Sequence, residues 1–217
     1  MSKKKKVRVR KEKIALTEEQ VKDYLKTIKE EDKKHSHRNY LMALTWFSTG
    51  LRVGEMCNFI VGWIEKSNDN YIHVKQNEAP FVFAPKYGST RRIAVQKDLI
   101  KELRKYLAGR TKGYVFKPQS NNQTNPYAKF HDKSPNPIFN KYFRETKSIG
   151  RNLGTHTFRR TFATQLAYSK PPVPLPKISY YLGHRDIQTT LNYLKQITND
   201  DHTELLNVDY IKDIYKY

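Results

Sequence analysis

The stretch GTHTFRRTFATQL, residues 154–166, predicts a helix with two distinct faces. Its apolar residues recur every four positions and form one stripe that suits a protein core; they are Phe158, Phe162 and Leu166. His156 and Arg159 are one turn apart on a different stripe. Because helix stability does not require a histidine and an arginine at these positions, we expect them to face a small, highly charged group.

The charge of the chain indicates a polyanionic partner. Its 217 residues contain 41 Lys+Arg against 21 Asp+Glu, a formal net charge of +20. Residues 1–13 hold eight Lys/Arg and one Glu, a net +7, and the remaining +13 belongs to residues 14–217. A basic tail alone is typical of a solvated arm, but a basic body as well favours nucleic acid. We therefore expect a flexible basic tail over 1–13 and one domain over 14–217.

Other features narrow the class of protein. The mean hydropathy is −0.82 and no long apolar run occurs, so we expect neither a membrane span nor a membrane partner. No apolar stretch follows the basic start, which argues against a signal peptide. Cys57 is the single cysteine, so no intrachain disulfide can form. We expect an intracellular protein, in the cytoplasm or nucleoid of a prokaryotic or virus-infected host cell.

Hydrophobic periodicity predicts a mainly α-helical fold with a small antiparallel β-sheet, in the α+β class. The runs YIHVK, FVFAP and RRIAVQ predict the sheet across residues 71–96, and SKPPVPLPK, residues 169–177, predicts a stiff break. Thr17 with Gln20 forms a capping-box pattern, Gly50 suits a helix end, and Asp186 suits a helix start. The expected helices cover about residues 17–30, 35–50, 51–60, 97–109, 138–148, 156–168 and 178–184, one from Asp186 onward, and a possible further helix in 198–217.

Four separated stretches carry side chains suited to one chemistry, and one of them is HTFRR with His156 and Arg159. STGLRVGE supplies Arg52 and Glu55, and KYGST supplies Lys86 in a turn between strands. LGHRDIQTTLNYL supplies His184 and, nine residues later, Tyr193. Tyr193 lies about 200° around its helix from Leu191, so we expect it off the buried face with an accessible hydroxyl. The expected buried stripe of this helix is Ile187, Thr190, Leu191, Leu194 and Ile197.

These groups fit phosphodiester transfer through a covalent enzyme intermediate. A tyrosine phenol can attack phosphorus and divide one difficult step into two. Paired arginine donors can stabilise the charge that the transition state spreads over the phosphate oxygens. A histidine can take the phenol proton, and a lysine can protonate the departing 5′ oxygen. No clustered Asp/Glu set stands out, and CxxC and HExxH patterns are absent, so we expect neither a metal nor another cofactor.

The segments TGLRVGE, HTFRRTFAT and LGHRDIQTTLNY, in this order, resemble three motifs of the tyrosine recombinases, the phage-integrase and Xer-like family. The resemblance spans roughly residues 14–197 and implies the family's catalytic domain. It implies that Arg52 and Arg159 hold the scissile phosphate and that Tyr193 forms a 3′-phosphotyrosyl link. It also implies that Lys86 is the general acid, and that Glu55 orients its surroundings. His156 and His184 then assist proton transfer and phosphate binding.

The resemblance also implies the partners of the protein. We expect it to bind double-stranded DNA as a homotetramer on paired sites and to be a monomer or weak dimer when free, with 198–217 docking on a neighbouring protomer. Three departures from the family stand out: Arg160 replaces a common histidine, 169–177 is unusual, and only the basic tail stands where a DNA-clamping domain is usual. The expected DNA contacts are Lys3, Lys4, Lys5, Lys6, Arg8, Arg10, Arg91, Arg92 and Arg160.

Two alternatives remain open at this point. A type IB topoisomerase uses similar chemistry but rejoins the same strand, so composition does not separate it from a recombinase. A non-catalytic DNA-binding protein derived from an integrase would be favoured if a catalytic position were lost, and none is. We therefore expect a site-specific recombinase or integrase. The sequence leaves open the DNA target, the host and whether integration, excision or dimer resolution dominates.

Overall fold

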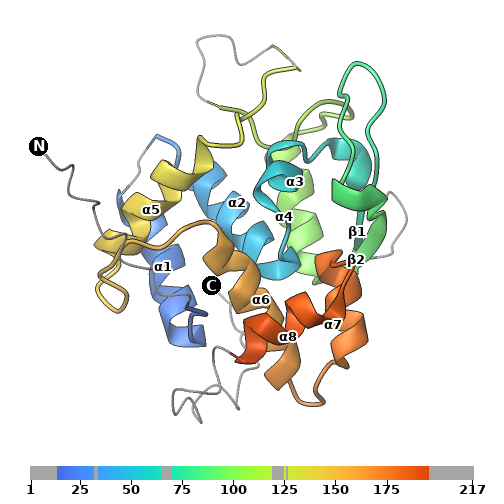
Figure 1. Cartoon of the computed structure of the whole chain (residues 1–217). Coiled ribbons are helices and arrows are strands. Elements are labelled where there is room, and N and C mark those ends of the chain that lie inside the picture. The colour runs from blue at the N-terminus through green and yellow to red at the C-terminus, as the bar shows by residue number, and fades with distance from the viewer. Residues whose placement is uncertain (1–13, 32–33, 65–69, 119–124, 126, 196–217) are drawn as a thin grey trace, which may run out of the picture.

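The computed structural model describes residues 14–195 except 32–33, 65–69, 119–124 and 126 (Figure 1). The predicted tail, residues 1–13, and the possible helix in 198–217 lie outside the described residues. The described helices are α1 (Glu18–Glu31), α2 (Ser36–Thr49), α3 (Val53–Cys57), α4 (Lys97–Leu107), α5 (Pro135–Glu145), α6 (His156–Tyr168), α7 (Leu175–Leu182) and α8 (Ile187–Lys195), with single 3₁₀ turns η1 (Val61–Trp63) and η2 (Lys86–Gly88).

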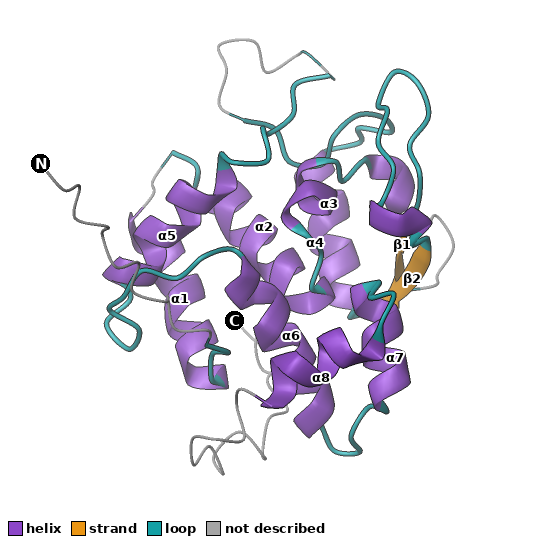
Figure 2. Cartoon of the chain, viewed as in Figure 1, coloured by secondary structure: helices purple, strands orange, loops and turns teal. Residues whose placement is uncertain are grey.

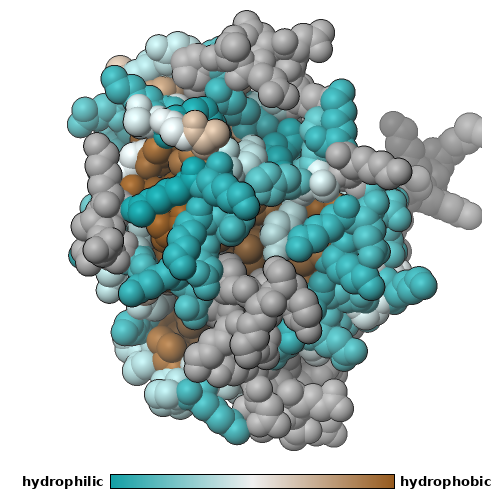
Figure 3. Space-filling model, turned by 180° about the vertical axis from the view of Figure 1, so that it is seen from behind, coloured by the Kyte–Doolittle hydropathy of each residue, from teal (hydrophilic) through white to brown (hydrophobic). Residues whose placement is uncertain are grey.

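Figure 2 shows that these helices make up most of the described chain, with one small sheet at an edge. The mainly α fold with a small antiparallel sheet is therefore confirmed. Hydrophilic side chains cover much of the described surface on the face opposite that of Figure 1 (Figure 3), in keeping with the high charge of the chain. In the part of the chain that the structure describes, no helix has both the length and the apolar content to span a membrane.

Local capping signals set several helix ends as the sequence predicts. The backbone N–H of Thr17 donates to Gln20 Oε1 at 3.1 Å, and the N–H of Gln20 donates to Thr17 Oγ1 at 3.2 Å, which is a capping box at the start of α1. Asp186 Oδ1 accepts from the N–H of Gln188 at 2.9 Å at the start of α8. Gly50 ends α2 in the left-handed conformation, with φ 59°, where a side chain would collide with the Phe162 ring.

The α6 helix lies at the centre of the core, between α2 and α8 (Figure 1). Its apolar stripe is confirmed, because Phe158 and Phe162 are buried and Leu166 is partly buried against the core. The Phe158 ring stacks on the Trp46 ring of α2, with centroids 4.7 Å apart and an interplanar angle of 1°. Such aromatic contacts add to the free energy gained by burying the rings. They fix the rotation of α6, and with it the direction of its polar face.

The predicted sheet is smaller than expected. Strands β1 (Tyr71–Val74) and β2 (Arg91–Ala94) pair antiparallel with Ile72 opposite Ile93. The FVFAP run was wrongly predicted as part of the sheet, since it contributes only an isolated bridge between Asn77 and Phe83. Pro80 precedes this run and Pro85 ends it, and neither can donate a ladder hydrogen bond, which explains why no strand forms there.

Some element boundaries also differ from prediction. The α5 helix begins at Pro135 and ends at Glu145, three residues before the predicted bounds, because proline suits the first helical turn. For the same reason α7 begins at Leu175, inside the predicted stiff break. It ends at Leu182 and is capped by Gly183, whose φ is 61°. The predicted stripe of α8 was partly wrong: Thr190 is fully buried, but Ile187 is 41% exposed. Ile197 lies outside the described residues.

Candidate active site

One pocket of about 1020 Å³ brings together side chains from five parts of the fold. Helices α3, α6 and α8, the 3₁₀ turn η2 and the loop between α7 and α8 all contribute to its wall. The predicted site residues that line it are Arg52, Glu55, Lys86, His156, Arg159, His184 and Tyr193. Every predicted catalytic residue, together with Glu55, is therefore adjacent to one cavity.

Arg159 is held rigidly by backbone carbonyls. Its side chain is buried, Nη1 donates to the carbonyl oxygen of Gly50 at 2.7 Å, and Nη2 donates to that of Leu182. Burial and the nearby charge of Arg52 lower the pKa of Arg159 to about 10, so it stays protonated at neutral pH. A guanidinium has five N–H donors, so these two bonds leave three for a ligand in the pocket.

Arg52 is fixed from two directions at the N-terminus of α3. Its Nη1 donates to Glu55 Oε1 at 3.1 Å, and its Nη2 donates to the carbonyl oxygen of Gly183 at 2.5 Å. The backbone N–H of Arg52 also donates to Glu55 Oε2 at 2.7 Å. Both arginines therefore hold carbonyls at the end of α7, which joins the Leu-Gly-His segment to the first arginine motif.

Glu55 organises a buried ion pair with Arg91. Its two carboxylate oxygens accept from Arg91 Nη1 at 2.9 Å and Nη2 at 2.8 Å, a bidentate arrangement with both side chains at most 2% exposed. Burial alone would raise the pKa of Glu55, but the hydrogen bonds and charge of Arg91 and the N–H of Arg52 outweigh it and lower that pKa. The orienting role of Glu55 stays a prediction, for which these contacts give a physical basis.

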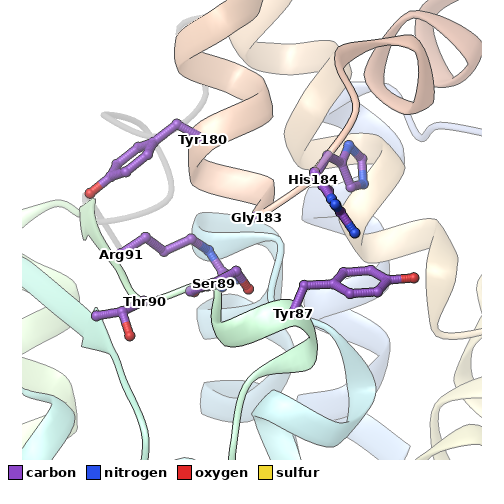
Figure 4. Close-up of a pocket in the computed structure, with 8 residues that line it drawn as sticks. Tyr87, Ser89, Thr90, Arg91, Tyr180, Gly183 and His184 are labelled. Carbon is purple, nitrogen blue, oxygen red and sulfur yellow. Dashed lines mark hydrogen bonds between the residues drawn. The ribbon is translucent and has the colours of Figure 1, made fainter.

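The structure corrects the predicted DNA contact at Arg91. Its guanidinium is buried, and Nε donates to the carbonyl oxygen of Tyr181 at 2.6 Å, so it cannot reach a DNA backbone. A Cβ on Gly183 would lie 2.9 Å from Arg91 Nη1 and 2.9 Å from Ser89 Oγ. The glycine of the Leu-Gly-His segment therefore admits the buried arginine between β2 and α7 (Figure 4).

For the other residues that we expect to contact DNA, this role remains a prediction. Arg92 is exposed, with its guanidinium 4.4 Å from the centroid of the Tyr71 ring. Arg160 is partly buried, with its guanidinium 5.5 Å from the centroid of the Tyr193 ring. The tail residues Lys3 to Arg10 lie outside the described residues.

His184 and Tyr193 meet at the pocket wall. Their ring centroids are 5.3 Å apart with an interplanar angle of 79°, and Nδ1 of His184 lies 2.8 Å from Thr190 Oγ1. Burial and the charges of Arg159, Arg52 and Arg91 lower the pKa of His184 to about 3, so its ring is neutral at pH 7. Tyr193 is partly buried and lines the pocket, on a different side of α8 from the fully buried Thr190. The contact between the Thr190 hydroxyl and the His184 ring was not predicted from the sequence.

His156 and Lys86 complete the set of titratable groups. His156 occupies the first position of α6. Desolvation and the charges of Arg159, Arg160 and Arg52 lower its pKa. Lys86 is exposed on η2, with Nζ 5.0 Å from the centroid of the neighbouring Tyr87 ring. Among the described residues, no group of three or more His, Cys, Asp or Glu side chains is arranged to hold a metal ion.

Several pocket residues were not among the predicted site residues, and two of them carry polar or charged groups next to the catalytic set. Tyr87 and Arg185 line the cavity next to Lys86 and His184, respectively. Each directly follows a predicted site residue, but aromatic and basic residues are so frequent in this chain that adjacency alone was not a signal. Only their positions in the pocket wall identify Tyr87 and Arg185 as site residues.

Comparisons with known proteins agree with the family resemblance of the sequence motifs. Residues 15–199 match the family model described as "Phage integrase family". The chain is 30% identical over 198 residues to tyrosine recombinase XerA of Saccharolobus solfataricus, which covers 91% of this chain and 57% of that protein. The chain spans about half the length of the curated relatives it matches.

Solved structures establish the fold. The crystal structure of XerA recombinase aligns with a TM-score of 0.64 at 19% identity, covering 96% of this chain and 65% of that one. The XerH site-specific recombinase, in a post-cleavage complex with a palindromic difH substrate, aligns with a TM-score of 0.64 at 19% identity, covering 85% of this chain and 50% of that one.

Proposed function

Because the chain belongs to the phage integrase family, we propose that it cleaves and rejoins DNA through a 3′-phosphotyrosyl intermediate. The observation that carries this proposal is the single pocket lined by all six predicted catalytic residues. DNA as the substrate is supported by the net charge of +20. It is further supported by the structural likeness to XerH, whose structure was determined on a difH substrate.

In the proposed cleavage step, the Tyr193 oxygen attacks the scissile phosphorus. The bond from phosphorus to the 5′ oxygen breaks, and the Lys86 ammonium gives a proton to that oxygen, so a 5′-hydroxyl leaves. The phenol proton passes to a neutral histidine. Burial and nearby arginines lower the pKa of both His156 and His184. Because Nδ1 of His184 already lies 2.8 Å from Thr190 Oγ1 and its ring packs against that of Tyr193, we assign this proton to His156 and give His184 the role of positioning the Tyr193 ring.

The two arginines act on the phosphate. Their guanidinium groups are already anchored by carbonyls and by Glu55, so donors not used in these bonds meet the charge that develops on the equatorial oxygens. Preorganised donors of this kind contribute about 2.7–4 kcal/mol each to transition-state stabilisation. Rejoining is the reverse reaction, with a 5′-hydroxyl attacking the phosphotyrosine.

Strand exchange between two DNA sites requires several protomers. We propose a homotetramer on paired sites and a monomer or weak dimer when free, as the family resemblance implies. The segment expected to link protomers, residues 198–217, lies outside the described residues. Truncation after Thr198 should therefore impair two-site recombination more than single-site binding.

The test is a covalent-adduct assay on nicked duplexes that carry a site selected for binding from a random-sequence pool. Wild-type protein should become attached to the 3′ end of the cut strand, in EDTA as well as in Mg²⁺. Tyr193→Phe should bind the same DNA without forming the adduct, and peptide mapping of the wild-type adduct should identify Tyr193. Tyr181→Phe is the matched control, because Tyr181 lies nearby on α7 but does not line the pocket.

An adduct that persists in Tyr193→Phe would refute the nucleophile assignment. Strict dependence on Mg²⁺ would refute the metal-free reaction. The same preparations separate strand exchange from topoisomerase activity, since relaxation of a supercoiled plasmid without a binding site would favour the topoisomerase alternative.

A further inference from the structure

A second pocket lies directly beside the catalytic one. It has a volume of about 410 Å³, within the range of pockets that hold small ligands, ~300–1,000 Å³. Three residues belong to the walls of both pockets: Tyr87, His184 and Arg185. Figure 4 shows Tyr87 on the turn after Lys86 and His184 at the end of α7, on opposite sides of this space. A ligand extending from the catalytic pocket can therefore enter the second one.

Tyr87 has an unusual backbone conformation in the tight turn that contains η2. Its backbone is left-handed, with φ 61° and ψ 24°, a region that non-glycine residues rarely adopt. Its side chain is 65% exposed, and no other aromatic ring within the described ranges packs against it. Because backbone strain of this kind clusters at functional sites, the exposed ring of Tyr87 is a candidate ligand contact.

Arg185 lines both pockets and supplies a positive charge between them. Its side chain is exposed and makes no ion pair in the described part of the chain. The second pocket thus offers a planar aromatic face and a guanidinium next to a site for phosphate. A nucleotide carries the two complementary groups, a base that stacks on aromatic rings and a phosphate that pairs with arginine.

The neighbouring Lys86 indicates which nucleotide this is. In the proposed reaction, Lys86 protonates the 5′ oxygen that leaves phosphorus, so the side chain next to it in the turn lies beside the departing nucleotide. We propose that the second pocket holds this nucleotide, with its base stacked on Tyr87 and its next phosphate facing Arg185. The proposal rests on the proposed function, and it makes Tyr87 a positioning residue for the leaving strand.

This subsite has a consequence for strand exchange. Once the bond to phosphorus breaks, the new 5′-hydroxyl end is held only by base pairing and by contacts of this kind. A stack on Tyr87 retains that end close to the phosphotyrosine, where it is in position to rejoin. Loss of the ring should therefore slow rejoining as well as cleavage.

The test is a cycle of two proteins and two substrates. Wild-type protein and Tyr87→Ala are each given duplexes with either a normal base or an abasic residue at the departing nucleotide, and single-turnover adduct formation is measured. Tyr87→Ala should be slower than wild type by roughly five- to 150-fold on the normal duplex, the effect of losing one base–aromatic stack. The abasic substitution should slow wild type by a similar factor and should slow Tyr87→Ala no further.

Matched variants separate stacking from folding. Tyr87→Phe keeps the ring and should behave as wild type, whereas Tyr87→Gly relieves the backbone strain and should lose the stack without losing thermal stability. Val82→Ala is the control, since Val82 is exposed on the same hairpin but lines neither pocket. An abasic residue on the other side of the scissile phosphate is the control for position.

Equal losses for Tyr87→Ala on both duplexes would overturn the proposal, as would unchanged cleavage by Tyr87→Ala. If wild type forms no adduct at all, the proposed function fails first. The cycle is then repeated as binding affinity in the Tyr193→Phe background, where the same pattern of coupled losses supports the subsite and independent losses reject it.

Discussion

Replacing Glu55 by alanine tests whether the buried pair with Arg91 holds the site together. The structure places both side chains at 2% exposure or less, joined by hydrogen bonds of 2.8 and 2.9 Å. In Glu55→Ala, Arg91 keeps its carbonyl contacts but loses its counter-charge. Leaving one member of a buried ion pair uncompensated costs about 3–5 kcal/mol. Because small domains have a stability of about 5–15 kcal/mol, the variant should be visibly destabilised.

The assay is urea unfolding at pH 7 of four proteins: wild type, Glu55→Ala, Arg91→Ala and the double variant. Each single variant should lower the midpoint with little change in slope. The double variant should lose less than the sum of the two, because it removes both members of the buried pair and leaves only Arg52, whose side chain is 21% exposed, without its carboxylate partner. Glu30→Ala is the control, since the Glu30–Lys26 pair is at least 64% exposed and should change stability by under about 1 kcal/mol.

Additive losses in the double variant would refute this reasoning, because they would mean that the two charges do not depend on each other. The pH dependence gives an independent check. The folded pKa of Glu55 lies below its unfolded value of ~4.3. The pair therefore stabilises the fold above that pH and loses its effect as the pH falls through the lowered pKa. Glu55→Ala should lack this acid-dependent component.

Three further outcomes follow from the site. Arg52→Lys and Arg159→Lys should each slow adduct formation by about 10²–10³, since an ammonium does not reproduce paired guanidinium donors; near-normal rates would contradict the clamp. Lys86→Ala should slow cleavage of ordinary DNA by ~10²–10⁴ but cleave a duplex with sulfur at the bridging 5′ position as wild type does, because a thiolate leaves without a proton. The pKa of His184 is about 3 in the folded protein against ~6.5 when unfolded, so the unfolded chain binds more protons between these two pH values. The free energy of unfolding should therefore fall as the pH falls through this window. In His184→Asn it should fall less steeply.

The sequence predicted those features that depend on a few neighbouring residues. The capping box at Thr17, the glycine end of α2 and the Asp186 cap of α8 are local hydrogen-bond patterns, and all three form. The fold class was predicted from hydrophobic periodicity, which also depends on residues close together in the sequence. Most of the pocket set was predicted because its residues stand in three recognisable motifs, whereas Lys86 comes from a separate turn, and the structure brings all of them to one cavity.

Features that depend on packing between distant elements were not predicted. Arg91 was expected to face DNA because it is basic and on a hairpin, but its burial is decided by Glu55 and by α7, 36 and 90 residues away. The missing strand at FVFAP reflects prolines that outweigh an apolar, aromatic pattern. The role of Tyr87 could not be predicted from the sequence, because the features that distinguish it are its left-handed backbone and its position in the walls of both pockets.

In the proposed reaction, the phosphate clamp is assembled before DNA arrives. Arg52 and Arg159 repel each other, yet both point at the end of α7, where the carbonyls of Gly183 and Leu182 accept their N–H groups. A helix C-terminus carries partial negative charge, so this end partly balances two guanidinium groups that would otherwise require an anion. DNA then meets donors that need little reorganisation, which is the condition for strong transition-state stabilisation. The same carbonyls flank His184, so the segment that holds the clamp also sets the position of the ring against Tyr193.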